Sequence, residues 1–197
     1  MKLIIIAEAG VNHNGNLKIA KKLVDVAKLA RADYVKFQSF TPDKLVTKNA
    51  PKANYQKSNF NKKETQNSML QKLQLSILDH LKLIKYCKKK KINFLSTAFD
   101  IDSLKFLLKN KINLIKIPSG EITNLPLLRY IKKQKKKVLL STGASTLKEV
   151  EQAIKVLNKK KNDITVLQCN SAYPTPISDL NLRTLNTFKK RFSCNIG

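Results

Sequence analysis

Short apolar runs alternate with longer amphipathic stretches along the whole 197-residue chain. The runs predict strands because they are short and rich in Val, Ile, Leu and Phe. They cover residues 3–7, 33–38, 93–96, 114–117, 137–141 and 165–169, and a seventh begins near Ser193. Six consecutive strand–helix units indicate a parallel sheet with right-handed crossovers.

Two of the amphipathic stretches show the helical repeat of apolar residues clearly. The first apolar face consists of Ile19, Leu23, Val24 and Ala27, and the second of Val150, Ala153, Ile154 and Leu157. Thr146 is followed three residues later by Glu149, which predicts a capping box at the start of the second helix.

Two architectures fit this alternation, the doubly wound open sheet and the (β/α)8 barrel. A doubly wound nucleotide-binding domain usually has a glycine-rich phosphate turn after its first strand. Here the turn reads EAGVNHNG at residues 8–15, which matches neither the dinucleotide fingerprint nor a P-loop. We therefore predict an α/β TIM barrel, truncated after about six βα units. Residues 39–75 form an unusually long connection, which is typical of a functional or a disordered segment.

Polar residues recur at the carboxyl ends of all six predicted strands, where barrel enzymes build their active sites. They are Glu8, Asn12, His13, Lys36, Gln38, Ser96, Thr97, Lys116, Ser119, Glu121, Ser141, Thr142, Asn170, Ser171 and Tyr173. Several are ambiguous when taken singly. The turn at residues 141–144 fits an anion site or, more simply, a helix cap, and His13 fits a ligand or a hydrogen-bonded loop residue.

Lys36 and Lys116 lie inside predicted strands, each between two apolar residues. Strand alternation points both lysines away from those neighbours, towards the barrel interior, where an unpaired ammonium group is costly. One interpretation is a site for phosphate and carboxylate groups. The other is a pair of structural salt bridges to Glu8 and Glu121. We favour the anion site, because perturbed charges cluster at functional sites.

The formal net charge of +26 would attract polyanions without specificity. However, the lysine clusters at residues 88–91, 132–133, 135–137 and 159–161 follow separate predicted helix ends, where cations complement the helix dipole. No arginine-rich arm, zinc finger or aromatic-basic motif accompanies them, so the charge does not predict a nucleic-acid partner.

The remaining composition indicates a protein of the cytoplasm. No run of about 18 apolar residues occurs, so we expect no membrane span. Cys87, Cys169 and Cys194 are widely spaced and suit reduced thiols, with Cys169 as a core residue. His80 lies in a lysine-rich helix and is expected to be solvated.

Six motifs in order along the chain resemble the sialic acid synthase family. They are AEAGVNHNG at 7–15, VKFQ at 35–38, LSTAFD at 95–100, KIPSGE at 116–121, LSTG at 140–143 and LQCNSAYPTP at 167–176. The resemblance implies condensation of phosphoenolpyruvate with an N-acetylated amino sugar, either N-acetylmannosamine or a diacetamido relative. Mn²⁺ or Mg²⁺ would polarise the sugar aldehyde, and C3 of phosphoenolpyruvate would attack it. Water would then add at C2. Phosphate would leave by C–O cleavage, giving a nonulosonic acid.

The resemblance also implies roles for individual residues. Phosphoenolpyruvate would be bound by Lys36, Thr97, Lys116, Ser119 and Ser171, the last at a position where relatives have another polar residue. Glu121 and Tyr173 would meet the sugar, Gln38 would shape the floor of the site, and Glu8 would transfer a proton or orient water. Glu8, Lys116 and Glu121 are thus the candidate catalytic residues, and residues 49–56 resemble the family's sugar-side loop.

The family's two metal-binding histidines are expected beyond Gly197, so no metal ligand is predicted within the chain. Residues 1–197 are interpreted as the N-terminal part of a synthase barrel, without its last units and the C-terminal antifreeze-like domain. Full-length relatives form homodimers. The alternatives are an inactive truncated fragment, a basic polyanion-binding protein, and another phosphoenolpyruvate-using barrel that makes a 3-deoxy-keto acid.

Overall fold

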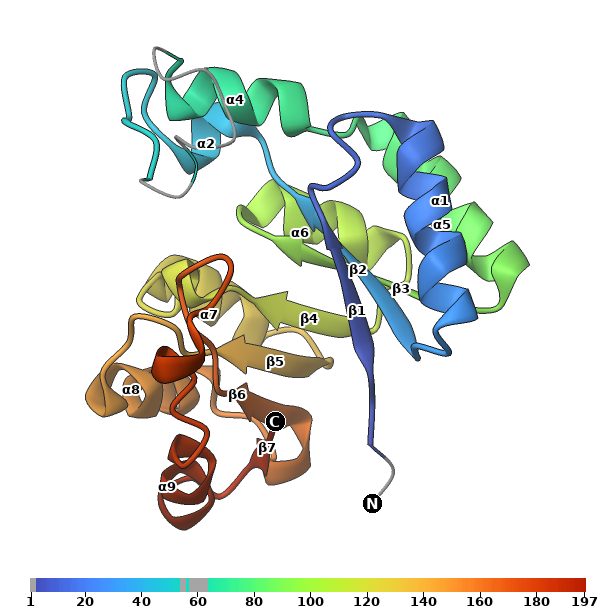
Figure 1. The fold of residues 1–197 in the computed structure, drawn as a ribbon. Coiled ribbons are helices and arrows are strands. Elements are labelled where there is room, and N and C mark those ends of the chain that lie inside the picture. The colour runs from blue at the N-terminus through green and yellow to red at the C-terminus, as the bar shows by residue number, and fades with distance from the viewer. Residues whose placement is uncertain (1–2, 54–55, 57–63) are drawn as a thin grey trace. The chain divides into compact units, whose positions relative to one another are not determined.

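The computed structural model describes residues 3–53, 56 and 64–197 (Figure 1). The chain divides into two compact units, Met1–Leu107 and Leu108–Gly197. Parallel strands alternate with helices in each unit, as the sequence predicts. Closure into a barrel, and the assignment of residues 1–197 to one barrel domain, stay predictions.

The first unit contains three parallel strands in chain order, β1 (Ile6–Gly10), β2 (Tyr34–Ser39) and β3 (Asn93–Ala98). Its helices are α1 (Leu17–Leu29), α2 (Pro42–Leu45), α4 (Gln66–Leu73) and α5 (Ile77–Lys90), and α6 (Ile101–Lys109) crosses the boundary between the units. Helices α1 and α5 pack side by side, α1 against β1 and β2 and α5 against β3 (Figure 1).

The second unit pairs β4 (Leu114–Ile117), β5 (Lys137–Ser141), β6 (Ile164–Leu167) and β7 (Asn195–Ile196) in the same parallel manner. Its α-helices are α7 (Leu125–Lys132), α8 (Leu147–Leu157) and α9 (Thr184–Arg191). Short 3-10 helices occupy Ser119–Glu121, Lys161–Asp163 and Ile177–Asp179. The predicted boundaries of β4 and β5 are confirmed, and β6 begins and ends earlier than predicted.

Local sequence signals account for the two predicted helices. Thr146 and Glu149 form the predicted capping box at the start of α8. In α1 the buried residues are Ala20, Val24 and Ala27. Ile19 was expected on this face but is 38% exposed, so it lies at the edge of the buried face.

The first strand was predicted at residues 3–7 and is found at Ile6–Gly10. Leu3 is 79% exposed, and Ile4 and Ile5 are more than half exposed. Pairing with β2 begins at Ile6 opposite Tyr34, so the first apolar residues precede the paired part of β1, and none of the described strands pairs with them. The expectation of a buried strand at 3–7 was therefore wrong at its start.

The long connection after β2 contains helices and a small apolar core. Helices α2 and α4 lie within it, and Phe40, Met69, Leu70 and Leu73 form a buried cluster there. This cluster gives the connection an apolar core of its own, which stabilises it in proportion to the apolar area removed from water. Asn54 and Tyr55, part of the predicted sugar-side loop, lie outside the described residues.

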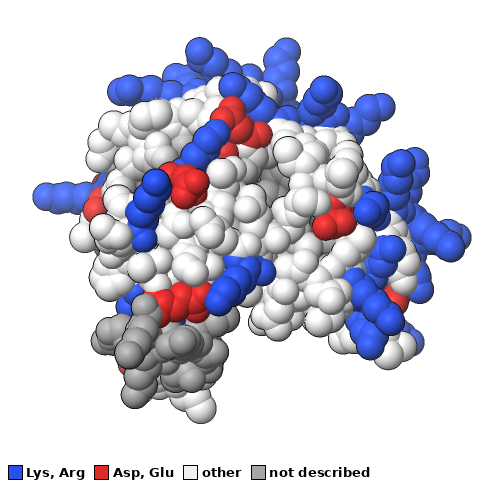
Figure 2. Space-filling model, turned by 90° about the horizontal axis from the view of Figure 1, so that it is seen from above, with Lys and Arg blue, Asp and Glu red and all other residues white. Residues whose placement is uncertain are grey.

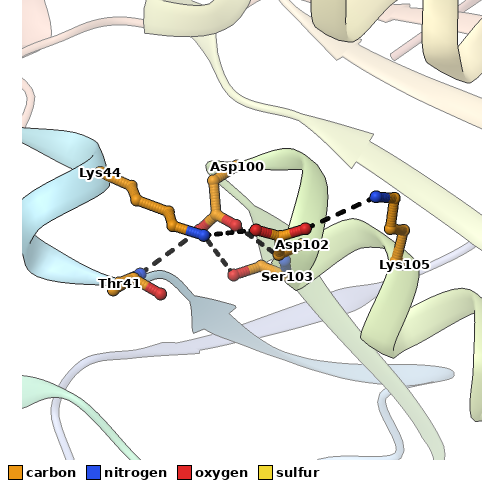
Figure 3. A network of polar contacts seen from close by, with 6 residues as sticks. All are labelled: Thr41, Lys44, Asp100, Asp102, Ser103 and Lys105. Atoms are coloured by element: carbon orange, nitrogen blue, oxygen red, sulfur yellow. Dashed lines mark hydrogen bonds and ion pairs between the residues drawn. The ribbon is translucent and has the colours of Figure 1, made fainter.

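A polar network ties this connection to the start of α6 (Figure 3). Asp100 accepts hydrogen bonds from the Thr41 backbone nitrogen at 3.3 Å and from Ser103 Oγ at 2.7 Å. Asp102 forms ion pairs with Lys44 of α2 and with Lys105, the latter at 3.6 Å. Asp100 also accepts from the Ser103 backbone nitrogen at 2.8 Å, so the carboxylate that caps α6 also holds the start of the connection.

The excess of basic residues is spread over the surface, and Figure 2 shows Lys and Arg in several separate groups on the visible face. Lys88, Lys89 and Lys90 occupy the last turn of α5, as the charge pattern predicts, and the following Lys91 has a left-handed backbone with φ of 55°. Within the described residues, no helix is both long enough and apolar enough to cross a membrane.

Candidate active site

The first unit brings four predicted site residues onto one face of its sheet. Val35 and Phe37 of β2 are fully buried on one face of the strand. Lys36 and Gln38 alternate with them and therefore point to the opposite face. The strand register places Glu8 of β1 beside Lys36, and Thr97 of β3 beside Gln38. Thr97 is 3% exposed, whereas the other three side chains are more accessible.

Lys36 and Glu8 form an ion pair, with side chains 13% and 48% exposed respectively. The contact between Lys36 and Glu8 that the salt-bridge interpretation expects is therefore present, and the role of Lys36 in an anion site stays a prediction. The carboxylate of Glu8 is half-exposed, so solvent can reach the ion pair.

Gly10 has a φ of +51°, and a Cβ there would lie 3.4 Å from Glu8 Oε1 and 3.8 Å from Gln38 Nε2. These are ordinary contact distances, so it is the left-handed backbone that favours glycine at this position.

The second unit buries the other predicted lysine. Lys116 is 8% exposed, and its Nζ donates hydrogen bonds to Ser141 Oγ at 2.6 Å and to the Ile117 carbonyl at 2.9 Å. Glu121, the expected partner in a structural salt bridge, instead accepts from Asn124 Nδ2 at 2.5 Å. Both of these acceptors are neutral oxygens.

Three strand ends of this unit converge around Gly143. Its backbone nitrogen donates to Ser119 Oγ at 2.8 Å. A Cβ at Gly143 would lie 2.9 Å from Ser171 Oγ and 3.0 Å from Ser119 Oγ. The predicted residues Ser119 and Ser171 therefore both contact the turn after β5. The N-cap of α8 is Thr146, so the simpler interpretation of residues 141–144 as a helix cap was wrong.

Replacing Gly143 with Ala should move the two serine hydroxyls apart. The added methyl group is closer to both oxygens than normal van der Waals contact allows, and it displaces the hydrogen bond to Ser119. We expect about 1 kcal/mol of destabilisation and about tenfold weaker phosphoenolpyruvate binding, the effect of one lost hydrogen bond in each case. Urea unfolding and calorimetric titration measure the two quantities, and Gly120→Ala is the control, because no atom lies within 4 Å of a Cβ there. Unchanged affinity in Gly143→Ala would separate this turn from the anion site.

Two predicted sugar-side residues lie on the accessible surface of the second unit. Tyr173 is 66% exposed, and the Tyr173–Pro174 peptide bond is cis. Glu121 belongs to the short 3-10 helix after β4 and is half-buried. Both side chains are accessible to a ligand from solvent, and their contact with a sugar stays a prediction.

Ser141 and Cys169 extend the group around Lys116 beyond the residues to which the sequence assigned roles. Cys169 Sγ donates to Ser141 Oγ at 3.1 Å, while Ser141 also accepts from Lys116. Alternation from the buried Leu140 could have placed Ser141 on the face of Lys116, whereas the contact with Cys169 depends on the pairing of β5 with β6. All three cysteines are free, and burial raises the pKa of Cys87 to about 12.

Both histidines are buried in the first unit. His13 is 1% exposed; its Nδ1 accepts from the Gly15 backbone nitrogen at 3.0 Å, and its Nε2 has no hydrogen-bond partner among the described residues. Burial, together with the nearby His80, lowers the pKa of His13 to about 4. The prediction that His80 is solvated was wrong, since it is 4% exposed and hydrogen-bonded to Ser39.

The described residues do not fit a metal centre. Among residues 3–53, 56 and 64–197 there is no group of three His, Cys, Asp or Glu side chains that could hold an ion.

The sequence profile of the NeuB family matches residues 23–197. The chain belongs to the NeuB family. This NeuB chain is 46% identical to the N,N'-diacetyllegionaminic acid synthase of Campylobacter jejuni, covering 100% of this chain and 60% of that protein. It is 43% identical to the synthase of the same name from Legionella pneumophila, of which it covers 57%. The NeuB chain thus spans about 60% of the length of these curated relatives.

A solved structure shows the same fold as this NeuB chain. It is the N-acetylneuraminic acid synthetase of Leptospira borgpetersenii in complex with citrate, which superposes with a TM-score of 0.85 at 30% identity. The match covers 100% of this chain and 64% of the solved chain. The family resemblance predicted from six sequence motifs is thereby confirmed.

Proposed function

We propose that this NeuB chain provides the phosphoenolpyruvate-binding part of a synthase that condenses phosphoenolpyruvate with an N-acetylated amino sugar and releases phosphate. Lys116 carries the proposal, because an ammonium group buried within a strand beside Ser141 Oγ is suited to binding a multiply charged anion. The names of the two relatives described above support the same reaction class.

In this proposal the polar side chains predicted from the strand ends bind phosphoenolpyruvate. Lys36 and Lys116 supply positive charge for its phosphate and carboxylate groups, and Thr97, Ser119 and Ser171 donate hydrogen bonds. A new bond forms between C3 of phosphoenolpyruvate and the sugar aldehyde carbon. Water then adds at C2, and phosphate leaves with its bridging oxygen by C–O cleavage.

Carboxylates are proposed to act on the cationic stage of this reaction. Glu8 is half-exposed and paired with Lys36, so it can orient or deprotonate the water that adds at C2. Negative charge near C2 also favours the oxocarbenium-like intermediate. Glu121 and Tyr173 are proposed to contact the sugar, and Gln38, beside Thr97 in the sheet, to shape the floor of the site.

The substrate that fits the comparisons best is a diacetamido sugar. The two relatives with 46% and 43% identity are both named for N,N'-diacetyllegionaminic acid, whereas the solved structure named for N-acetylneuraminic acid has 30% identity. We further propose that the whole protein closes as a TIM barrel, works as a homodimer in the cytoplasm, and uses a divalent metal held by residues other than those described.

Phosphate release from phosphoenolpyruvate tests this function in the full-length protein. We expect release only when an acylated amino sugar and Mn²⁺ or Mg²⁺ are both present, with a higher kcat/KM for the diacetamido sugar than for N-acetylmannosamine. Omission of the sugar and addition of a chelator are the controls. Release that continues without sugar or metal would contradict the proposed reaction. Salt-sensitive binding of arbitrary DNA, with no response to phosphoenolpyruvate, would favour a polyanion-binding protein instead.

A further inference from the structure

A buried chain of hydrogen bonds crosses β2, β3 and α5 on the face opposite to Gln38 and Thr97. Ser39, Ser96 and His80 are 4%, 1% and 4% exposed. His80 Nε2 lies 3.0 Å from Ser39 Oγ, which lies 2.7 Å from Ser96 Oγ. Val35 and Phe37 on the same face of β2 are apolar and fully buried. The three polar side chains therefore lie in a mainly hydrophobic layer between strands and helix, in which His13 packs against Phe37.

Both ring nitrogens of His80 have hydrogen-bond partners. Nδ1 lies 3.0 Å from the Ser76 carbonyl oxygen, which accepts only, so Nδ1 carries a proton. Nε2 lies 3.0 Å from Ser39 Oγ and 3.3 Å from the Gln38 carbonyl oxygen, so it contacts both the side chain and the backbone of β2. Ser39 Oγ in turn bridges Nε2 and Ser96 Oγ. Every member of the chain thus has a partner, which is the condition under which a buried polar network makes a structure rigid.

The chain of hydrogen bonds is specific for one alignment of β2 and β3. Ser39 pairs with Ala98 and Ser96 with Phe37, so the bond between the two serines is diagonal across the sheet. Residues 40–92 separate the two strands, and no tight turn fixes their alignment. A slip of one strand by one residue would place Gln38 and Thr97 on opposite faces of the sheet, because side chains alternate along a strand.

We propose that His80 is a positioning residue for the anion site. Through Ser39 and Ser96 it fixes the alignment of β2 and β3, and this alignment holds Gln38 and Thr97 side by side on the substrate face. The proposal rests on the proposed function for its substrate, phosphoenolpyruvate. His80 also packs edge-on against the ring of Phe106, with centroids 6.0 Å apart, so a purely packing role is the alternative that the test must separate.

The test compares four proteins in the full-length background: wild type, His80→Leu, His80→Gln and Leu83→Val. Leucine keeps the apolar volume and removes the hydrogen-bond partner of Ser39. The glutamine amide restores a hydrogen-bonding group near the position of Nε2. Leu83 is fully buried one turn along the same helix and makes no part of the chain, so Leu83→Val is the control for lost packing.

Phosphoenolpyruvate binding by calorimetry is the first measurement. We expect about tenfold weaker binding in His80→Leu, less than threefold in His80→Gln, and no change in Leu83→Val despite its lower melting temperature. Ser39→Ala added to His80→Leu should weaken binding no further, because the chain is already broken. Equal affinity in all four proteins would overturn the proposal. So would a loss in Leu83→Val as large as that in His80→Leu.

Amide hydrogen exchange in the absence of ligand is the second measurement, and it is independent of the proposed function. We expect faster exchange over residues 34–39 and 93–98 in His80→Leu than in Leu83→Val, with recovery in His80→Gln. Unaltered exchange would overturn the positioning role. If the wild type did not bind phosphoenolpyruvate, the proposed function would fail, and His80 would no longer be assigned to an anion site. The exchange result would still decide whether His80 aligns the two strands.

Discussion

Lys116→Met is expected to weaken phosphoenolpyruvate binding by about 100-fold without destabilising the protein. A charge-assisted hydrogen bond to an anion contributes about 1.5–3 kcal/mol, and loss of the larger value corresponds to roughly two orders of magnitude in Kd. Methionine has nearly the length of lysine and fills the same space within β4. Because a buried ammonium group is costly, its removal should leave the free energy of unfolding unchanged or higher.

Calorimetric titration and urea unfolding of the same preparations measure the two effects of Lys116→Met. Lys161→Met is the matched control, since Lys161 lies on the surface of the same unit in the short helix before β6. The control removes the same charge and should change Kd less than twofold. Equal losses in the two variants would mean that binding depends on net charge, and the assignment of Lys116 to the anion site would be wrong. Ser141 retains its hydrogen bond from Cys169 in the variant, which limits secondary effects.

The second large effect expected is a loss of stability in mild acid, caused by His13. Burial lowers the pKa of His13 from 6.5 to about 4. Between these values the unfolded chain binds a proton at this residue and the folded chain does not, so stability falls as the pH is lowered. The stabilisation is complete above pH 6.5 and is lost progressively down to about pH 4, a total of about 3 kcal/mol.

Urea unfolding of wild type and His13→Asn at a series of pH values tests this prediction. Asn Oδ1 can still accept from the Gly15 backbone nitrogen, and the variant has no titrating ring at this position. The dependence on pH between 6.5 and 4.5 should therefore be markedly shallower in His13→Asn. Asn12→Ser in the same turn is the control and should follow wild type. Parallel curves for wild type and His13→Asn would mean that the pKa of His13 is the same in the folded and unfolded protein, which would contradict the prediction.

The sequence was most informative where strand alternation was regular. Lys36 and Lys116 could be assigned to the face opposite their apolar neighbours, because a strand between buried residues has only two faces. The beginning of β1 could not be predicted, since Leu3, Ile4 and Ile5 have the same hydrophobicity whether or not a neighbouring strand is present. Pairing with β2 decides their burial, and pairing is not a local property.

Contacts between distant residues account for most of what the sequence did not predict in the site. Gly143 meets Ser119 and Ser171 through the pairing of three strands, which no spacing within a single motif encodes. His80 is different, because a signal was present. It precedes the buried residues Leu83 and Cys87 by three and seven positions, the repeat of an apolar helix face. The lysines around it drew attention to charge and away from that repeat.

The left-handed backbone of Lys91 has a consequence for the evolution and engineering of this sequence. The described part of the chain places seven non-glycine residues at positive φ, among them Arg31, Lys91 and Lys111, whereas the whole chain contains five glycines. Left-handed conformations of such residues cost roughly 1 kcal/mol each, and glycine adopts them without a steric penalty. Basic residues therefore hold three of these strained positions, and Arg31, Lys91 and Lys111 are all exposed. Glycine at these three positions offers a way to raise the melting temperature without a change in the candidate binding residues.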